Sequence, residues 1–325
     1  MTVELHPSSA TPQDRLPLAW QVAPETIAFI LDIEAASRNA RDLVDGLIFA
    51  AIQSANVSAI SNDPELQLAY AALPDAPPED LRRPVSISAI ANSLRMPFET
   101  ARRRIQALAT LGALQVTSRG VLIAQGVLGN LAFLKPVVQR HEVLQAFYLN
   151  MKVRGVPALP MTAPASAPLP LHTSPPIRLT NRLIWEYILR VADDLGAAVG
   201  STTSGVILLA MIHENTEGFS PAERIAWSRA PRRFAKPVRN GRLATRLNFS
   251  SETLRRHVIA LEARGFCARD PGGLIALAPP DARPALDRLA LDNLVHLQRL
   301  FARLRQFGVL ALWDEPELTA SAAGA

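Results

Sequence analysis

The sequence contains a long internal repeat, and this repeat limits the possible folds more than any other feature. At an offset of 153 positions, residues 84–156 align without a gap with residues 237–309. The most similar segments are ETARRRIQALATLGAL, which begins at Glu99, and ETLRRHVIALEARGFC, which begins at Glu252. Further upstream, GLIFAAIQSAN from Gly46 aligns with GVILLAMIHEN from Gly205 at an offset of 159. We infer that a whole domain has been duplicated, and we call the two segments copy one and copy two.

The repeat and the composition between its copies divide the chain into two domains. Residues 157–176 contain seven prolines, which favours an extended, semi-rigid linker over a packed element. Both ends of the chain have the composition of disordered tails. We therefore expect a disordered tail over residues 1–23, a first domain over 24–156, a linker over 157–180, a second domain over 181–314 and a second disordered tail over 315–325.

Within copy one, the pattern predicts a helix, a turn, a second helix and a two-stranded hairpin. Ala101, Ile105 and Leu108 recur at helical spacing and mark the inner face of the second helix. Gly112 is suited to end that helix in a left-handed cap. The expected elements are a buried helix over 43–55, helices over 87–94 and 97–111, a strand–turn–strand over 113–124 and a final helix over 134–154.

Copy two predicts the same order of elements. Leu254, Val258 and Leu261 form the inner face of its second helix, and Ser250 or Ser251 is suited to cap it. The expected elements are a first helix over 242–247, a turn over 248–250, a hairpin with residues 271–273 at its tip and a final helix over 282–307. The fold expected for the chain is mainly α (α+β), with two tandem winged helix-turn-helix domains, each with extra N- and C-terminal helices.

The second helix of each copy carries a motif that resembles a known family. The shared pattern E-T-x-R-R-x-[IV]-x-A-L-x-x-x-G, from Glu99 and from Glu252, resembles the recognition helix of bacterial winged helix-turn-helix transcription regulators of the DeoR and GntR kind. The resemblance covers about 40 residues in each copy, and the effector-binding domains of those families have no match here. It implies binding of double-stranded DNA through the second helix, with the hairpin on the DNA backbone.

The exposed face of each second helix supplies the candidate DNA contacts. At about 100° per residue, Arg103 lies opposite the inner face, which makes it the candidate for base edges. In copy two the corresponding residue is Arg256. The other candidates are Thr100, Arg102, Gln106 and Arg119 in copy one, and Ser251, Thr253 and Arg255 in copy two. Arg102 and Thr100, with Arg255 and Thr253, are the candidates for phosphate contacts.

In copy two, a long segment rich in basic residues precedes the second helix and extends into it. From Arg229 to Arg256 there are nine positive residues, and Glu252 is the only carboxylate in that span. Such a run suits phosphate neutralisation and predicts a steep salt dependence of binding. It adds Arg232, Arg233, Arg239 and Arg246 to the candidate contacts. Copy one is poorer in charge, with Arg82, Arg83 and Arg95 before its second helix, so we expect copy two to bind DNA more tightly.

The final helices carry apolar stripes that require a covering surface. In copy two, Leu294, Leu297 and Leu304 recur at helical spacing. Packing within the same chain and homodimerisation through these helices fit this pattern equally well. The sequence therefore leaves a homodimer open as a prediction.

The composition argues against several other classes of protein. A single cysteine, Cys267, permits no internal disulfide and fits a cytoplasmic, nucleoid-associated setting, and we expect it to be a small core residue. The six histidines show no metal-ligand spacing, and no phosphate-binding or nucleophile motif is present. We therefore expect no metal, no cofactor and no enzymatic activity. No apolar stretch reaches about 18 residues without a charge, so we expect no membrane segment.

Three functions fit these features. The leading one is a sequence-specific transcription regulator in which two modules on one chain bind adjacent sites. The alternatives are a plasmid-type replication initiator that binds origin repeats, and a protein that uses winged domains to dock other proteins, like the kleisin-binding subunits of bacterial condensin. Phe29, Trp185 and Tyr187, which lie upstream of the two motifs, are expected in the core rather than in a sensor cavity. The sequence names no effector.

Overall fold

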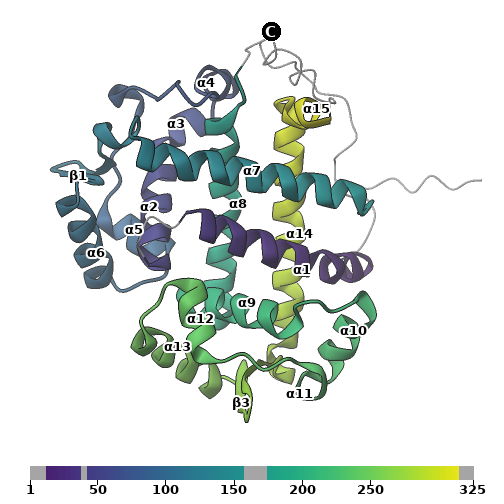
Figure 1. Cartoon of the computed structure of the whole chain (residues 1–325). Coiled ribbons are helices and arrows are strands. Elements are labelled where there is room, and N and C mark those ends of the chain that lie inside the picture. The colour runs from purple at the N-terminus through teal and green to yellow at the C-terminus, as the bar shows by residue number, and fades with distance from the viewer. Residues whose placement is uncertain (1–11, 38–41, 157–173, 315–325) are drawn as a thin grey trace, which may run out of the picture.

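The computed structural model describes residues 12–37, 42–156 and 174–314. These residues form a mainly helical molecule with two small antiparallel sheets (Figure 1). The predicted tails over 1–11 and 315–325 and most of the predicted linker, residues 157–173, lie outside the described residues.

Copy one is built from a helical frame and a two-stranded hairpin. Its elements are α1 (Pro12–Ala36), α2 (Leu43–Asn56), α3 (Ser58–Ser61), α4 (Pro64–Ala69), η1 (Glu79–Leu81), α5 (Ile87–Ser93), α6 (Phe98–Thr110), β1 (Leu114–Thr117), β2 (Gly120–Ile123), η2 (Gln125–Val127) and α7 (Leu131–Val153). The expected helices of this copy and its hairpin are thus confirmed, with ends that shift by a few residues.

Copy two repeats this frame. Its elements are α8 (Ile177–Val199), α9 (Thr202–Thr216), α10 (Pro221–Arg229), α11 (Pro231–Phe234), α12 (Asn240–Leu247), α13 (Ser251–Ala263), β3 (Cys267–Asp270), β4 (Gly273–Ala276), η3 (Pro280–Ala282), α14 (Arg283–Gln306) and α15 (Val309–Asp314). Ser250 caps α13, since its Oγ accepts a hydrogen bond from the backbone N–H of Thr253 at 3.1 Å. Helices α10 and α11 were not predicted.

The two hairpins have the same register. Leu114 pairs with Ile123 in one hairpin, and Cys267 pairs with Ala276 in the other, at the same offset of 153. An isolated backbone bridge joins the preceding segment to each hairpin, between Val85 and Val121 in copy one and between Val238 and Leu274 in copy two. Cys267 is a buried core residue, and burial raises the pKa of its thiol to about 12.

A buried asparagine fastens each hairpin to the helix behind it. In copy one, Asn56 at the end of α2 donates to the carbonyls of Arg83 and Val121 and accepts from the N–H of Ile123. In copy two, Asn215 at the end of α9 makes the same three kinds of contact with residues 236, 274 and 276. One amide side chain thus satisfies backbone groups of the bridging segment and of the hairpin at once.

Four long helices join the two copies into one body. Helices α1 and α7 of copy one lie side by side and cross α8 and α14 of copy two (Figure 1). The pairing is reciprocal, because α7 packs on α8 and α14 packs on α1. Leu294, Leu297 and Leu304 of α14 are fully buried in this layer. The apolar stripe that suggested a homodimer is therefore covered within one chain.

Aromatic rings mark the centre of the four-helix layer. Phe29 of α1 stacks on Phe147 of α7 with ring centroids 4.4 Å apart. Tyr187 of α8 and Phe301 of α14 lie within 6.0 Å of these two rings. Phe29 and Tyr187 are thus core residues, as expected.

The structure corrects the predicted domain boundaries at two places. Residues 12–23 belong to helix α1 and are not a disordered tail, because Ala19 and Val22 are buried in the four-helix layer. Residues 177–180 belong to α8 and not to the linker. Both helices lie outside the repeated motif, and each packs on helices of its own copy as well as on helices of the other copy.

Candidate nucleic-acid interface

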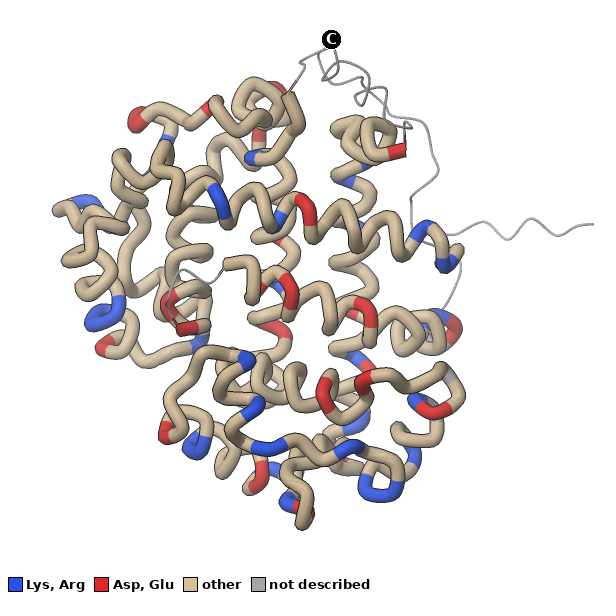
Figure 2. The backbone as a smooth tube through the Cα atoms, in the orientation of Figure 1, with Lys and Arg blue, Asp and Glu red and all other residues tan. Residues whose placement is uncertain are grey.

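Helices α6 and α13 hold the candidate DNA contacts on their exposed faces. Ala101, Ile105 and Leu108 bury the inner face of α6, and the equivalent residues of α13 are buried in the same way. Both helices lie on one side of the molecule (Figure 1). Lys and Arg occur on α6, α12 and α13 on that side, and others occur around α11 at the lower right (Figure 2).

The outermost arginines of these helices are free to bind another molecule. Arg103 and Arg256 are exposed, and among the described residues neither forms a hydrogen bond or ion pair. Their neighbours Arg102 and Arg255 behave differently, because each donates two hydrogen bonds to the glutamate three residues earlier. These bonds hold the pKa of Glu99 and Glu252 below its usual range.

The paired glutamates fix the direction of Arg102 and Arg255 along the helix surface. An exposed i, i+3 ion pair contributes little to stability, so a phosphate competes with it at small cost. The geometry therefore leaves Arg103 and Arg256 as the principal candidates for base edges.

The residue that follows Arg103 or Arg256 faces inward and connects its helix to the start of α2 or α9. Arg104 of α6 forms ion pairs with Asp42, at 2.9 Å, and with Asp45, at 2.7 Å. In copy two the same position holds His257, which shares a 2.9 Å hydrogen bond with Ser204. Since Asp45 and Ser204 also correspond at the offset of 159, both members of this contact have changed together between the copies.

Arg246 does not fit the role predicted for it. Its guanidinium forms a 3.0 Å ion pair with Glu214, whose side chain is only 3% exposed. Arg242 pairs with the same glutamate and with Glu217. Two arginines of the basic run thus neutralise one buried carboxylate of α9, and removing either leaves a buried charge poorly compensated.

The remaining basic residues stay available at the surface. Arg232, Arg233 and Arg239 are exposed and form no ion pair among the residues that the structure describes. Arg119 extends from the tip of the copy-one hairpin, where its backbone N–H donates to Thr117. Of the polar candidates, Gln106 and Ser251 are exposed, whereas Thr100 and Thr253 are half-buried near the starts of α6 and α13.

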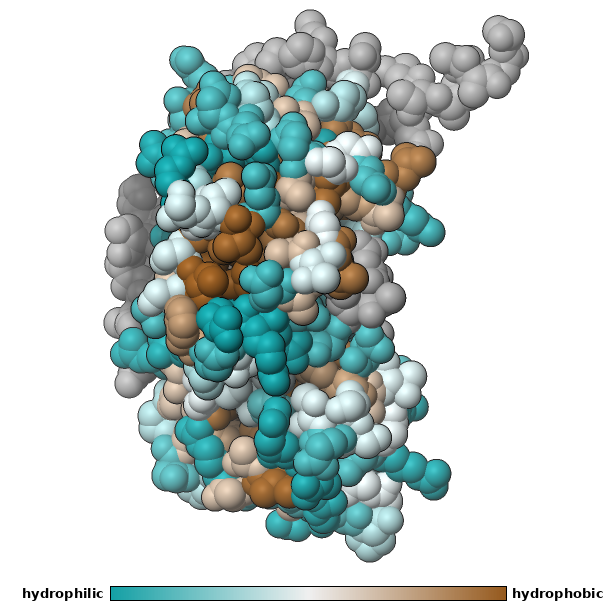
Figure 3. Space-filling view, turned by 90° about the vertical axis from the view of Figure 1, so that its left-hand side faces the viewer, coloured by the Kyte–Doolittle hydropathy of each residue, from teal (hydrophilic) through white to brown (hydrophobic). Residues whose placement is uncertain are grey.

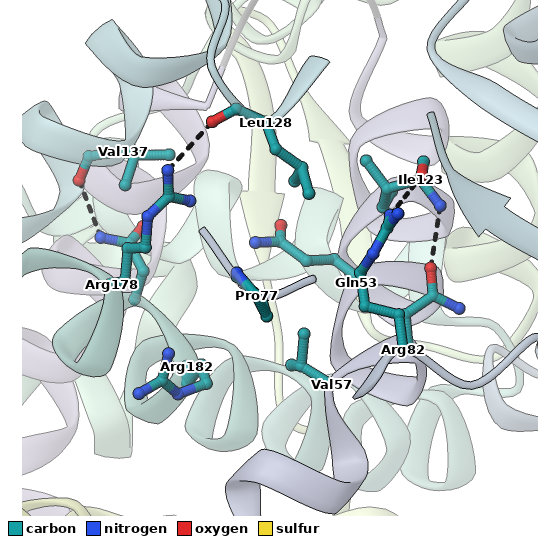
Figure 4. Close-up of a pocket in the computed structure, with 11 residues that line it drawn as sticks. Gln53, Val57, Pro77, Arg82, Ile123, Leu128, Val137, Arg178 and Arg182 are labelled. Atoms are coloured by element: carbon teal, nitrogen blue, oxygen red, sulfur yellow. Dashed lines mark hydrogen bonds between the residues drawn. The ribbon is translucent and has the colours of Figure 1, made fainter. Parts of the chain in front are cut away.

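Arg82 lies in the interior and not at the surface. It donates to the carbonyl of Ile123 at 2.8 Å (Figure 4). It also donates to the side chain of Gln125. Arg178 and Arg182 of α8, on the other side of the same small cavity, also donate to backbone carbonyls. Arg178 and Arg182 thus connect copy two to copy one, whereas Arg82 connects two segments within copy one. Because Arg82 is buried, it adds nothing to the basic surface.

Copy one has apolar side chains where copy two has polar or charged ones. Phe98, Leu111 and Val116 are 51%, 69% and 45% exposed. Ser251, Arg264 and Arg269 take the equivalent positions of copy two. The face that carries α6 and the β1–β2 hairpin shows a cluster of hydrophobic surface among hydrophilic residues (Figure 3). The alignment of the two copies contains this difference, and the exchange of Phe98 for Ser251 already indicates it in the sequence.

Comparison with known proteins gives no match. No protein-family model, no curated protein and no solved structure matches this chain. By length and composition alone, the part of α1 over Asp14–Ala36 is long and apolar enough to cross a membrane. Helices α8 and α9, which are bent by 95° to each other, are also long and apolar enough when they are counted together as one span. Buried core helices pass the same test, and α8 and α9 are core helices here.

Proposed function

We propose that each copy is a winged helix-turn-helix module and that the chain is a sequence-specific DNA-binding transcription regulator. One observation carries the proposal. Arg103 and Arg256 occupy equivalent positions on α6 and α13, and both helices have their opposite face buried. Both arginines are exposed, and neither has an ion-pair partner within the described part of the chain. An arginine in this setting is free to form a bidentate contact with a guanine in the major groove.

The surroundings of the two arginines support different roles for the two modules. Copy two adds Arg232, Arg233 and Arg239 close to its hairpin and first helix, and these residues suit phosphate contacts. Copy one contributes fewer exposed charges. We therefore assign most of the affinity to copy two and expect copy one to add sequence preference.

The apolar surface of copy one favours a second candidate function. Phe98, Leu111 and Val116 suit a protein partner better than a phosphate backbone. In this alternative only copy two binds DNA, and copy one docks another protein to it.

Selection of genomic fragments by the purified chain, at two salt concentrations, tests the proposal. A variant with Arg103→Ala and Arg256→Ala is compared with a control that carries Lys152→Ala and Arg154→Ala, which removes the same charge from the end of α7. We expect wild type and control to enrich the same few promoter fragments and the double variant to lose them. Equal, weak binding of all fragments by all three proteins would contradict base reading, and enrichment of tandem repeats at one locus would support an initiator instead.

A further inference from the structure

A cavity of about 520 Å³ lies between α1, α2, α7 and α8. Most of its lining is apolar, including Ile30, Leu47, Phe133 and Ile188. This volume is within the usual range for sites that bind small organic molecules. We propose that the cavity binds a small organic monoanion, with an apolar ring or branched chain as its body and a carboxylate held by Arg140.

Arg140 is the polar group that defines the site. It lines the cavity and is 5% exposed. Its Nε donates to Asn181 at 2.8 Å, Nη1 lies 3.3 Å from the Oγ of Ser37, and Nη2 makes no hydrogen bond within the described residues. The guanidinium also lies 5.1 Å from the centre of the Trp185 ring, whose own N–H is buried without a partner.

Arg140 has no carboxylate partner among the described residues. A buried cation without a counter-ion is unfavourable, and burial lowers the pKa of Arg140 to about 9. A carboxylate at Nη2 would compensate this charge with a charge-assisted hydrogen bond. The ring faces and aliphatic side chains around it would cover the rest of the ligand.

The other charged groups of the cavity limit the ligand to a single negative charge. Glu34, Asp42 and Asp45 also line the cavity. Asp42 and Asp45 already form ion pairs with Arg104 of α6, so Arg104 is not free to bind a second anionic group. A second anionic group on the ligand would meet repulsion from this wall.

Comparison of the two copies shows that this site belongs to copy one. At the position of Arg140, copy two has Asn293, which accepts from the Tyr187 hydroxyl at 2.8 Å and donates to Thr26 at 3.0 Å. The asparagine is therefore satisfied by the protein itself, whereas the arginine has a free donor.

The glycines at the equivalent positions of α2 and α9 show the same difference. A Cβ added at Gly46, which lines the cavity, would meet nothing within 4 Å, whereas at Gly205 it would lie 2.9 Å from Leu195 Cβ. Helix α8 thus packs closely on α9, and α2 keeps open space at the matching point.

The cavity wall is connected to the candidate DNA-binding helix. Asp42 and Asp45 line the cavity, and they are also the residues that hold Arg104 of α6. A ligand beside them is positioned to change how α6 is held. That consequence rests on the function proposed above, whereas binding of the ligand does not.

The binding proposal is tested without DNA, by calorimetry on the full chain with 1-naphthoate as probe and 1-naphthalenemethanol as its neutral counterpart. A thermal-shift panel of aromatic and branched aliphatic monocarboxylates accompanies it. We expect saturable binding of naphthoate, at least ten-fold tighter than that of the alcohol. No binding of naphthoate together with no thermal stabilisation by any panel member up to 10 mM, about the weakest affinity of practical use, would overturn the proposal.

Two variants test the site itself. Gly46→Leu fills the open space on α2 and is expected to abolish binding while the thermal transition stays at or above that of wild type. Arg140→Gln is expected to weaken naphthoate at least ten-fold and to leave the alcohol unchanged. Unaltered naphthoate binding by a folded Gly46→Leu would place the ligand elsewhere and contradict the proposal. Since no DNA is present, these results stand whether or not the chain binds DNA.

Discussion

Arginines in this chain have different roles, and the role depends on what lies beneath each side chain. Arg103 is exposed and unpaired, Arg102 is bound to a glutamate on its own helix, Arg104 ties its helix to α2, and Arg140 faces a cavity. Helical spacing predicts that Arg103 points outward. It does not predict that Arg246 is held by Glu214, because that contact depends on where α9 lies under α12.

The position of Arg140 in the sequence already indicates that this arginine is buried. It lies four residues after Pro136 and four before Leu144, on the buried face of α7. A charged residue at core spacing needs a partner or a ligand. Trp185, which was expected to be a plain core residue, is a wall of the same cavity.

The buried His141 predicts a pH dependence of stability. The Thr180 hydroxyl donates to the carbonyl of Ile177, so it accepts from Nδ1 of His141, which lies 2.8 Å away. Burial lowers the pKa of His141 from 6.5 to about 4. The unfolded chain therefore takes up this proton at a higher pH than the folded chain, and stability falls as the pH falls from about 6.5 to about 4.

The size of this effect is about 3 kcal/mol. Urea unfolding at pH 7 and pH 4.5 measures it, with His141→Asn as the comparison because asparagine keeps a donor and does not titrate. A smaller loss of stability is expected for the variant. The same loss in both proteins would assign the pH dependence to other groups.

Asn56 is predicted to be among the most costly polar residues to remove. Its side chain satisfies two carbonyls and one N–H in the interior, so Asn56→Ala leaves these groups without partners. We expect a loss of about 3 kcal/mol in the free energy of unfolding. Asn62→Ala, at an exposed position, is expected to change it by less than about 0.5 kcal/mol. Equal effects of the two substitutions in urea unfolding would contradict this role.

At the scale of elements, the repeat predicted almost everything inside the two motifs. The positions of α5, α6, α12, α13 and the two hairpins follow from helical spacing, turn residues and the offset of 153. The helices that were not predicted are α1, α3, α4, α8, α10, α11 and α15. Pro12, Pro17 and the polar residues around them indicated a tail, but burial of Ala19 and Val22 in the four-helix layer outweighs those local signals.

The hairpin glycines are predicted to be required for this geometry. Gly120 has a φ of 134°, and an added Cβ would lie 2.7 Å from the carbonyl oxygen of Val85. Gly273 has the same conformation beside Val238. Gly120→Ala should therefore destabilise the chain by roughly 2 kcal/mol or more. Gly126→Ala is the control, since a Cβ there meets nothing within 4 Å. Thermal unfolding of both variants distinguishes strain from a general effect of alanine.

At the scale of the whole molecule, the two sequence repeats do not correspond to two separate cores. Each copy gives its first and last long helices to one shared layer, and α8 contacts α2, α7 and α14. The sequence could not predict this exchange, because each apolar stripe is equally well covered by its own copy, by the other copy or by a second chain.

The shared layer predicts that the halves depend on each other. Residues 1–165 and 166–325, produced separately, are expected to expose large apolar faces and to lack a cooperative thermal transition. Mixed or co-expressed, they should form a one-to-one complex with a single transition. A half that melts cooperatively as a monomer would contradict the interleaved core.

The central claim is that the two exposed arginines read DNA bases. The most direct test is the affinity of wild type, Arg103→Ala and Arg256→Ala for an enriched genomic site and for a scrambled duplex of the same length, at one salt concentration. If each arginine reads a base, each substitution should weaken the enriched site by about 1–3 kcal/mol, or roughly five- to 150-fold, and leave the scrambled duplex nearly unchanged. Equal losses on both duplexes would show that these residues contact only the backbone and would contradict the claim.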